Sequence, residues 1–273
     1  MNKLVRSVGI ISAAVTFGAG TALAAPLAGA QSSLPGSSAG AQADVDDCGV
    51  TTVTPSGLKA AGWSTPSDET PAEIGAVADA PAEVGAAAVT FPVADPAVGT
   101  SLYKNANKMP LAELMEGDEL VDLSYDYFSS GQAPALQIRV NGADLADSES
   151  NAGGYDIGFA TIVHSPANSD GEWKTADPGE SDSFWVTRAL KGEDGQVIPR
   201  MTMMTFEQIL ELNWDAVVTE YGVQKTKENV ATNDAVDNFT LGCETTNFEL
   251  ADEDGSAGSL SGIFGSVSGI FQS

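Results

Sequence analysis

The sequence predicts an all-β protein, a two-sheet antiparallel β-sandwich with one short helix near residues 204–212. Three observations support this prediction. Apolar and polar residues alternate through the middle of the chain, which is typical of strands with one buried face. Gly, Pro, Asn and Asp interrupt these segments roughly every 8–12 residues. One segment has both a helix cap and an apolar stripe at helical spacing.

The first 24 residues have the parts of a secretory signal peptide. Lys3 and Arg6 supply a basic start, residues 8–20 are apolar but too short to cross a bilayer, and Ala24 ends a small-residue cleavage site. We expect cleavage after Ala24; a second small-residue site ends at Ala30. The protein is therefore expected to be secreted, or associated with the cell envelope, in a bacterium.

Composition divides the rest of the chain into three parts. Residues 25–46, rich in Ala, Gly and Ser, predict a flexible leader because they bury too little apolar surface to fold. Residues 47–243 predict the β-sandwich domain, in which the Pro- and Ala-rich segment 64–88 is expected to be a long loop or excursion. Residues 244–273 are expected to form an acidic spacer and an apolar Ser/Gly tail.

The strands follow one another with short punctuation. In the segment 134–140, Leu136, Ile138 and Val140 fall on an inward face, and Gln137 and Arg139 are expected in water. The predicted strands, in chain order, are 50–54, 88–93, 99–104, 120–128, 134–140, 155–163, 214–223 and 234–243. The segment 154–188 as a whole predicts a strand, an acidic turn, a strand, a loop and a strand, with Trp173 and Trp185 near the strand ends.

The predicted helix lies between the later strands. Thr205 can cap its start, and Gln208, three residues on, completes a capping box. Phe206, Ile209 and Leu210 form its apolar stripe.

Cys48 and Cys243 lie at opposite ends of the predicted domain. In an exported protein an even pair of cysteines predicts a disulfide. The chain-entropy model gives a loop this long a stabilisation of about 4–5 kcal/mol. Two buried free thiols are the alternative.

The chain is strongly acidic, with 38 acidic against 12 basic residues and a formal net charge of -26. Nucleic acid and anionic lipid would be repelled by such a surface, so neither is an expected partner. Residues 259–273 carry apolar side chains at helical spacing but are shorter than the ~20 residues needed for a transmembrane span. Peripheral contact with the envelope through this tail is one interpretation, and a tail without fixed structure is the other.

No catalytic constellation is recognisable, so we expect a protein that is not an enzyme. His164 is the single histidine and is predicted to lie on the face of its strand opposite Thr161 and Val163. A glycoside hydrolase needs only two carboxylates and stays an alternative.

Three aromatic residues and one polar pair are candidates for binding. Trp173, Trp185 and Tyr155 could stack on sugar rings, although aromatic side chains are more often core residues. Asp237 and Asn238 could hold a structural calcium ion; an ordinary turn is the alternative, and no other cofactor is expected.

Four segments carry a resemblance to a known family. They are VTPSGLKAAGW (53–63), PLAELMEGDELVDLSYDYF (110–128), FATIVHSP with EWKTAD and FWVTR (159–188), and TFEQILELNWDAVV with AVDNFTLG (205–242). Together they resemble an uncharacterised jelly-roll domain of bacterial secreted proteins, related in shape to concanavalin-like and carbohydrate-binding sandwiches. The chain has His164-Ser165 where the family pattern has Tyr-Glu, and Ala176 where it has a second Trp.

These observations favour a non-catalytic binding module, secreted or on the cell surface, with a glycan or envelope polymer as its ligand. A structural envelope protein attached through its C-terminal tail is the first alternative. A hydrolase acting on glycosides is the second.

Overall fold

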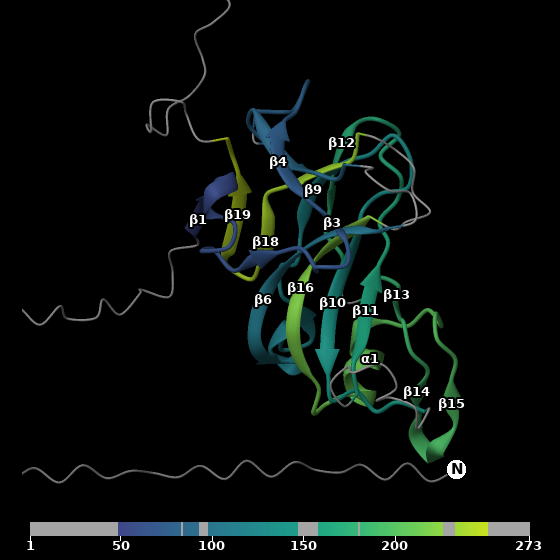
Figure 1. Ribbon diagram of the computed structural model, residues 1–273. Coiled ribbons are helices and arrows are strands. Elements are labelled where there is room, and N and C mark those ends of the chain that lie inside the picture. Colours follow the sequence, from purple (N-terminus) through teal and green to yellow (C-terminus); the bar gives the residue numbers. More distant parts are fainter. Residues whose placement is uncertain are drawn as a thin grey trace, which may run out of the picture. The chain divides into compact units, whose positions relative to one another are not determined.

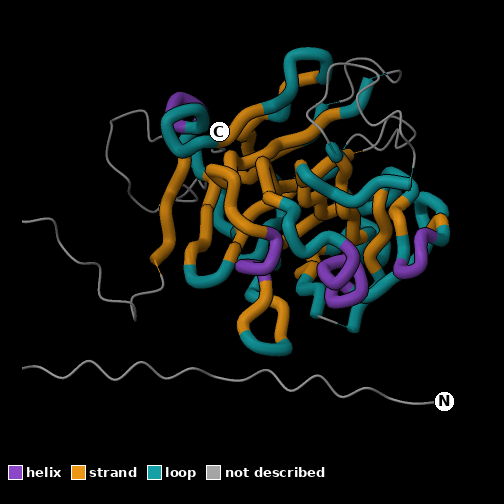
Figure 2. Tube along the Cα trace, turned by 90° about the horizontal axis from the view of Figure 1, so that it is seen from below, coloured by secondary structure: helices purple, strands orange, loops and turns teal. Residues whose placement is uncertain are grey.

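The computed structural model describes residues 49–82, 84–92, 98–146, 158–179, 181–225 and 233–250. This part of the chain is all-β, as predicted: strands dominate the trace and the helices are short (Figure 2). Ala24, the leader, Cys48, Tyr155 and the tail 259–273 lie outside the described residues.

A seven-stranded sheet has the strand order β13-β11-β10-β16-β6-β2, with β3 also paired to β6 (Figure 1). All of its pairs are antiparallel except β3 with β6. Its strands are β2 (Trp63–Ser64), β3 (Thr70–Pro71), β6 (Thr100–Pro110), β10 (Ala135–Asn141), β11 (Ala160–His164), β13 (Phe184–Val186) and β16 (Val217–Lys225).

A five-stranded antiparallel sheet has the order β12-β9-β17-β5-β4. Its strands are β4 (Glu73–Ala76), β5 (Ala87–Thr90), β9 (Tyr125–Phe128), β12 (Trp173–Ala176) and β17 (Ala235–Asp237).

Smaller elements complete the described fold. In a three-stranded sheet, β1 (Gly49–Val53) runs parallel to β19 (Glu244–Phe248), which pairs with β18 (Phe239–Leu241). The remaining elements are the hairpins β7 (Met115–Glu116) with β8 (Glu119–Leu120) and β14 (Leu190–Lys191) with β15 (Val197–Ile198), the 3₁₀ turns Pro55–Gly57, Leu111–Leu114 and Glu193–Gly195, and α1 (Phe206–Leu212).

Both large sheets contribute alternate residues to one hydrophobic core. The five-stranded sheet supplies the cross-strand row Tyr127, Val236, Val89 and Ile74, and the seven-stranded sheet supplies Leu102, Val223, Leu136, Ile138 and Ile162. Trp63, Phe239 and Phe248 extend this core toward the three-stranded sheet, with ring centroids 5.3–5.5 Å from Trp63. The strands are therefore held together by burial of their apolar faces.

The predicted helix is confirmed as α1, with its capping box. The backbone N–H of Gln208 donates to Thr205 Oγ1 (3.3 Å), and the backbone N–H of Thr205 donates to Gln208 Oε1 (3.0 Å). Phe206, Ile209 and Leu210 are buried, as their spacing indicates.

Two predicted boundaries differ from the structure. The segment 64–88, expected to be a loop, contains β3 and β4, and Ile74 and Val84 are buried in it. The folded part also continues past Cys243, because β19 pairs with both β1 and β18 and buries Phe248. Part of the expected spacer is thus a strand.

Two predicted side-chain environments were wrong. Gln137 points away from the core as predicted, but it is only 8 % exposed because neighbouring polar side chains cover it. In β11 the core-facing residues are Ala160 and Ile162, so Thr161 and Val163 lie on the opposite face. His164 pairs with Leu136 and shares the core-facing side, where its ring lies 5.3 Å from that of Phe184.

Candidate functional site

Trp173 lies in a row of residues that crosses the outer face of the five-stranded sheet, the face opposite the core. Directly paired residues in antiparallel strands share a face. The pairing runs from Trp173 to Phe128, from Phe128 to Ala235 and from Ala235 to Thr90. The adjacent row, which contains Tyr127 and its partners, is core. Strand alternation therefore turns the indole ring outward.

This row forms the floor of an open pocket of about 870 Å³, which we call the Trp173 pocket. The rings of Trp173 and Phe128 are 5.9 Å apart and inclined at 48°, and both side chains are partly exposed. Strands β4 and β12 are the two edge strands of this sheet, and both are labelled in the upper part of Figure 1. The lining residues are Ala76, Val77, Ala78, Asp79, Pro81, Thr90, Phe128, Gly171, Glu172, Trp173, Asn233, Asp234 and Ala235.

A buried polar cluster supports one wall of the Trp173 pocket. Asp234 accepts a hydrogen bond from Ser129 Oγ (2.6 Å) and pairs with Lys225, with 3.1 Å between Nζ and Oδ2. Ser169 Oγ in turn donates to the backbone carbonyl of Ser129 (2.8 Å) and accepts from its N–H (2.6 Å). These bonds tie the loops around the pocket to the ends of β9 and β16.

Trp185, the second predicted platform, lies on β13 in the other large sheet. It pairs with Val163 and faces outward there, so the structure does not bring it into the row that contains Trp173. The two tryptophans therefore lie on different sheets.

The outer face of the seven-stranded sheet carries a chain of hydrogen-bonded side chains. Tyr103 donates to Gln137 (2.6 Å), Gln137 donates to Gln224 (2.6 Å), and Gln224 donates to Glu69 (3.2 Å). Ser101 also donates to Glu69. These groups satisfy one another in a largely buried setting, as buried polar groups usually do.

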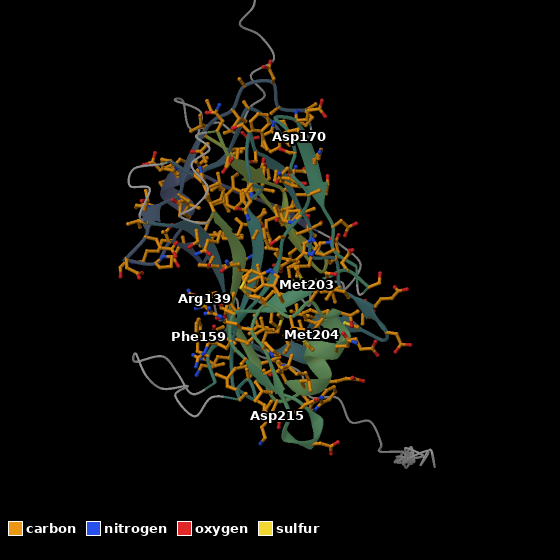
Figure 3. All side chains as sticks on the ribbon, turned by 90° about the vertical axis from the view of Figure 1, so that its right-hand side faces the viewer. Arg139, Phe159, Asp170, Met203, Met204 and Asp215 are labelled. Atoms are coloured by element: carbon orange, nitrogen blue, oxygen red, sulfur yellow. The ribbon has the colours of Figure 1, made fainter. Side chains whose placement is uncertain are left out.

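Arg139 lies over this row of hydrogen-bonded side chains, on its solvent side. Its guanidinium carbon lies 4.9 Å from the centre of the Tyr103 ring and 5.1 Å from that of Phe159, and Nη1 is 2.6 Å from Glu220 Oε2. Figure 3 shows Arg139 and Phe159 together on one side of the sheet. The guanidinium is thus held by two rings and a carboxylate.

Asp237 is the last residue of β17 in the five-stranded sheet, and it is fully buried. Oδ1 accepts a hydrogen bond from the backbone N–H of Phe248 (2.8 Å), whereas Oδ2 is buried without a partner. The pKa of Asp237 is raised to about 8, first by burial and also by the carboxylates of Glu249 and Asp126, against the opposing effect of the backbone hydrogen bonds. A protonated carboxyl group is therefore favoured at this position.

The calcium site predicted at Asp237 and Asn238 stays a prediction. Asn238 has a positive φ of 48° and its amide nitrogen donates to Asp126 Oδ2 (2.9 Å). Within the described segments no three His, Cys, Asp or Glu side chains gather in a group that could hold a metal ion.

Sequence reasoning identified one aromatic residue of the Trp173 pocket and missed the rest. Phe128 could have been predicted from the sequence. Tyr125 and Tyr127 share one face of the strand, so Phe128, the next residue, must face the other way. Thr90 lies on β5, which pairs with β17, and Asp234 directly precedes β17, which pairs with β9. These pairings join segments far apart in the sequence.

Comparison with known proteins finds no matching family model, curated protein or solved structure. The helices in the described residues are too short or too polar to cross a membrane.

Proposed function

We propose that this chain is a non-catalytic binding module, secreted or on the cell surface, and that it holds a glycan or another envelope polymer in the Trp173 pocket. The proposed architecture is a jelly-roll sandwich. The support for it is that two large, mainly antiparallel sheets contribute their apolar faces to one core.

One observation carries the proposed function: a partly exposed indole ring lies in the floor of an open pocket, beside a second aromatic ring. A sugar presents an apolar C–H face to such a ring and hydroxyl groups to the polar atoms around it. Thr90, with its hydroxyl group, and Asp79 and Glu172, with exposed carboxylates, line the same pocket as Trp173. Aromatic contact with a few polar groups is the usual composition of a small-ligand site.

Two buried acidic residues of this region, Asp237 and Asp234, are poorly placed to catalyse hydrolysis. Asp237, whose raised pKa would suit a general acid, is 0 % exposed and cannot contact a polymer. Asp234 is 1 % exposed and is engaged by Lys225 and Ser129. The bonds of both carboxyl groups are made to other parts of the protein, so their role is structural.

Because the chain is expected to be exported, the proposed ligand lies outside the cell. The proposed disulfide between Cys48 and Cys243 agrees with export. Gly49 pairs with Glu244 in the parallel ladder of β1 and β19, and each cysteine directly precedes one of these residues. The structure has no free cysteine among its described residues.

The test is a glycan array followed by isothermal titration calorimetry of the best oligosaccharide with the mature chain. Trp173→Ala is expected to weaken binding at least about tenfold, because truncation of an aromatic anchor removes most of its contact. Trp214→Ala is the matched control, since Trp214 is 67 % exposed and does not line the pocket. Unchanged affinity for Trp173→Ala, or no binding to any glycan or cell-wall fraction, would overturn the proposal.

A further inference from the structure

The described charged residues that line the Trp173 pocket all carry the same sign. Asp79, Glu172 and Asp234 are lining residues, whereas no described lining residue is Lys or Arg. The three carboxylates have different surroundings, and these surroundings decide what charge a ligand would meet.

Asp234 contributes little net charge to the pocket because its partner lies directly behind it. Lys225 Nζ is 3.1 Å from Asp234 Oδ2, and the two side chains are 3 % and 0 % exposed. The opposite charges of this pair largely cancel in their effect on a ligand in the pocket. Lys225 is also too deeply buried to reach a ligand, so it gives no site for an anion.

Asp79 and Glu172 keep their charge toward the ligand. Both are exposed at the rim of the pocket, and neither forms an ion pair with a described cation. Lys174 is close in sequence but has the opposite strand parity to Trp173. Its ammonium group donates to the carbonyl of Asn168 (2.7 Å) and lies 4.0 Å from Asp170. It therefore does not neutralise the rim.

We infer that the Trp173 pocket selects sugar units that carry an ammonium group, accepts neutral units more weakly and rejects uronates and sulfated sugars. This inference rests on the proposed function. An ammonium group is attracted by the rim carboxylates and by the face of the indole ring. An anionic group is repelled by the rim carboxylates and is not attracted by the ring face. The net charge of -26 acts in the same direction during the approach of the ligand.

The experiment uses three oligosaccharides with the same β-1,4 linkage and length, whose sugar units carry an amine at C2, no charged group, or a carboxylate at C6. Oligoglucosamine, kept below the pKa of its amine, is cationic; the cello-oligosaccharide is neutral; the oligoglucuronate is anionic. The mature wild-type chain is expected to bind the cationic oligomer at least about fivefold more tightly than the neutral one at low salt, with no measurable binding of the anionic one. The preference is expected to shrink as salt is added.

The double variant Asp79→Asn/Glu172→Gln tests the assignment to the rim. It should lose the preference for oligoglucosamine while keeping its affinity for the neutral oligomer. Asn readily adopts the positive φ of 55° found at Asp79, so the backbone of the turn is preserved. The matched control is Glu113→Gln/Glu211→Gln, which removes the same charge from exposed positions that do not line the pocket.

The outcomes separate this inference from the function on which it rests. If the anionic oligomer binds as tightly as the cationic one, or if the rim variant and the control variant behave alike, the charge selectivity is wrong and sugar binding stands. If none of the three oligomers and no array glycan binds, the proposed function fails and the selectivity fails with it.

Discussion

Lys225 and Asp234 form an ion pair inside the protein, with 3.1 Å between Nζ and Oδ2. Lys225 ends β16 of the seven-stranded sheet, and Asp234 directly precedes β17 of the five-stranded sheet. Lys225 Nζ also donates to the carbonyl of Phe91 (3.4 Å), and Asp234 accepts from Ser129 Oγ. The pair therefore links the two large sheets at the wall of the Trp173 pocket.

Removal of one member of this pair should be costly. Lys225→Met leaves the Asp234 carboxylate buried without its cation, so we expect the free energy of unfolding to fall by about 3–5 kcal/mol. Lys225→Met/Asp234→Asn should cost clearly less than the sum of the two single variants, because no unpaired charge remains. Urea unfolding of the four proteins measures the coupling. Additive single effects would contradict the pairing.

The period-two pattern predicted the strand 134–140 well, because alternation is a local property of the sequence. It predicted which residues turn away from the core but not what covers them. Gln137 is buried by Tyr103 and Gln224, which lie 34 and 87 residues away in the chain. Such partners are set by the strand order, which no local pattern specifies.

The candidate site illustrates the same limit. Trp173 and Trp185 look equivalent in sequence, yet β12 and β13 join different sheets. Phe128 reaches Trp173 only through the cross-strand register of β9 with β12. Strand β4 was missed because it is four residues long and lies in a segment rich in Ala, Pro and Gly, whose composition is typical of a loop.

The stability of the protein should depend on pH through Asp237. Its pKa is about 8 in the folded protein, against 3.8 for an ordinary aspartate, so between these values unfolding releases a proton. The stabilisation is complete below 3.8 and is lost as pH rises through about 8, at a rate of up to about 1.4 kcal/mol per pH unit. Chemical unfolding over this range measures the slope.

Asp237→Asn should abolish this dependence, since the amide cannot ionise and its oxygen can still accept the hydrogen bond from Phe248 N–H. The variant is expected to be more stable than the wild type near pH 8, and the difference should decrease toward pH 4. Asp118→Asn, at an exposed position, is the control. A wild-type slope that survives in Asp237→Asn would assign the titration to another group.

The close approach of β16 to β6 should require Gly222. A Cβ atom added there would lie 2.1 Å from the carbonyl oxygen of Leu102 and 2.9 Å from the Cα of Tyr103, both backbone atoms. Gly222→Ala must therefore separate the two strands, and we expect a loss of about 3 kcal/mol in the free energy of unfolding.

Gly75→Ala is a suitable comparison in the other sheet. Its new methyl group would meet the side chain of Thr90 at 3.5 Å, which is ordinary van der Waals contact. Thermal unfolding should leave this variant close to the wild type. If Gly222→Ala melts at the same temperature as Gly75→Ala, the register of β16 with β6 is not the one described.

The proposed disulfide closes a loop of almost the whole folded chain, because Cys48 directly precedes β1 and Cys243 directly precedes β19 in the sequence. Gly49 pairs with Glu244, and Cys48 and Cys243 directly precede these two residues in the sequence. Loss of a cross-link over so long a loop should lower the free energy of unfolding by about 4–5 kcal/mol. Cys48→Ser/Cys243→Ser should therefore melt at a lower temperature than the oxidised wild type.

Reduction separates this effect from that of the substitutions themselves. A reducing agent should lower the melting temperature of the wild type to that of the double serine variant and leave the variant unchanged. Alkylation of the unfolded, non-reduced chain followed by mass measurement counts the free thiols, and we expect none. Two alkylated cysteines per oxidised chain would show that the thiols are free, and the first and last strands would then be held together by their hydrogen-bond ladder and by the burial of Phe248 alone.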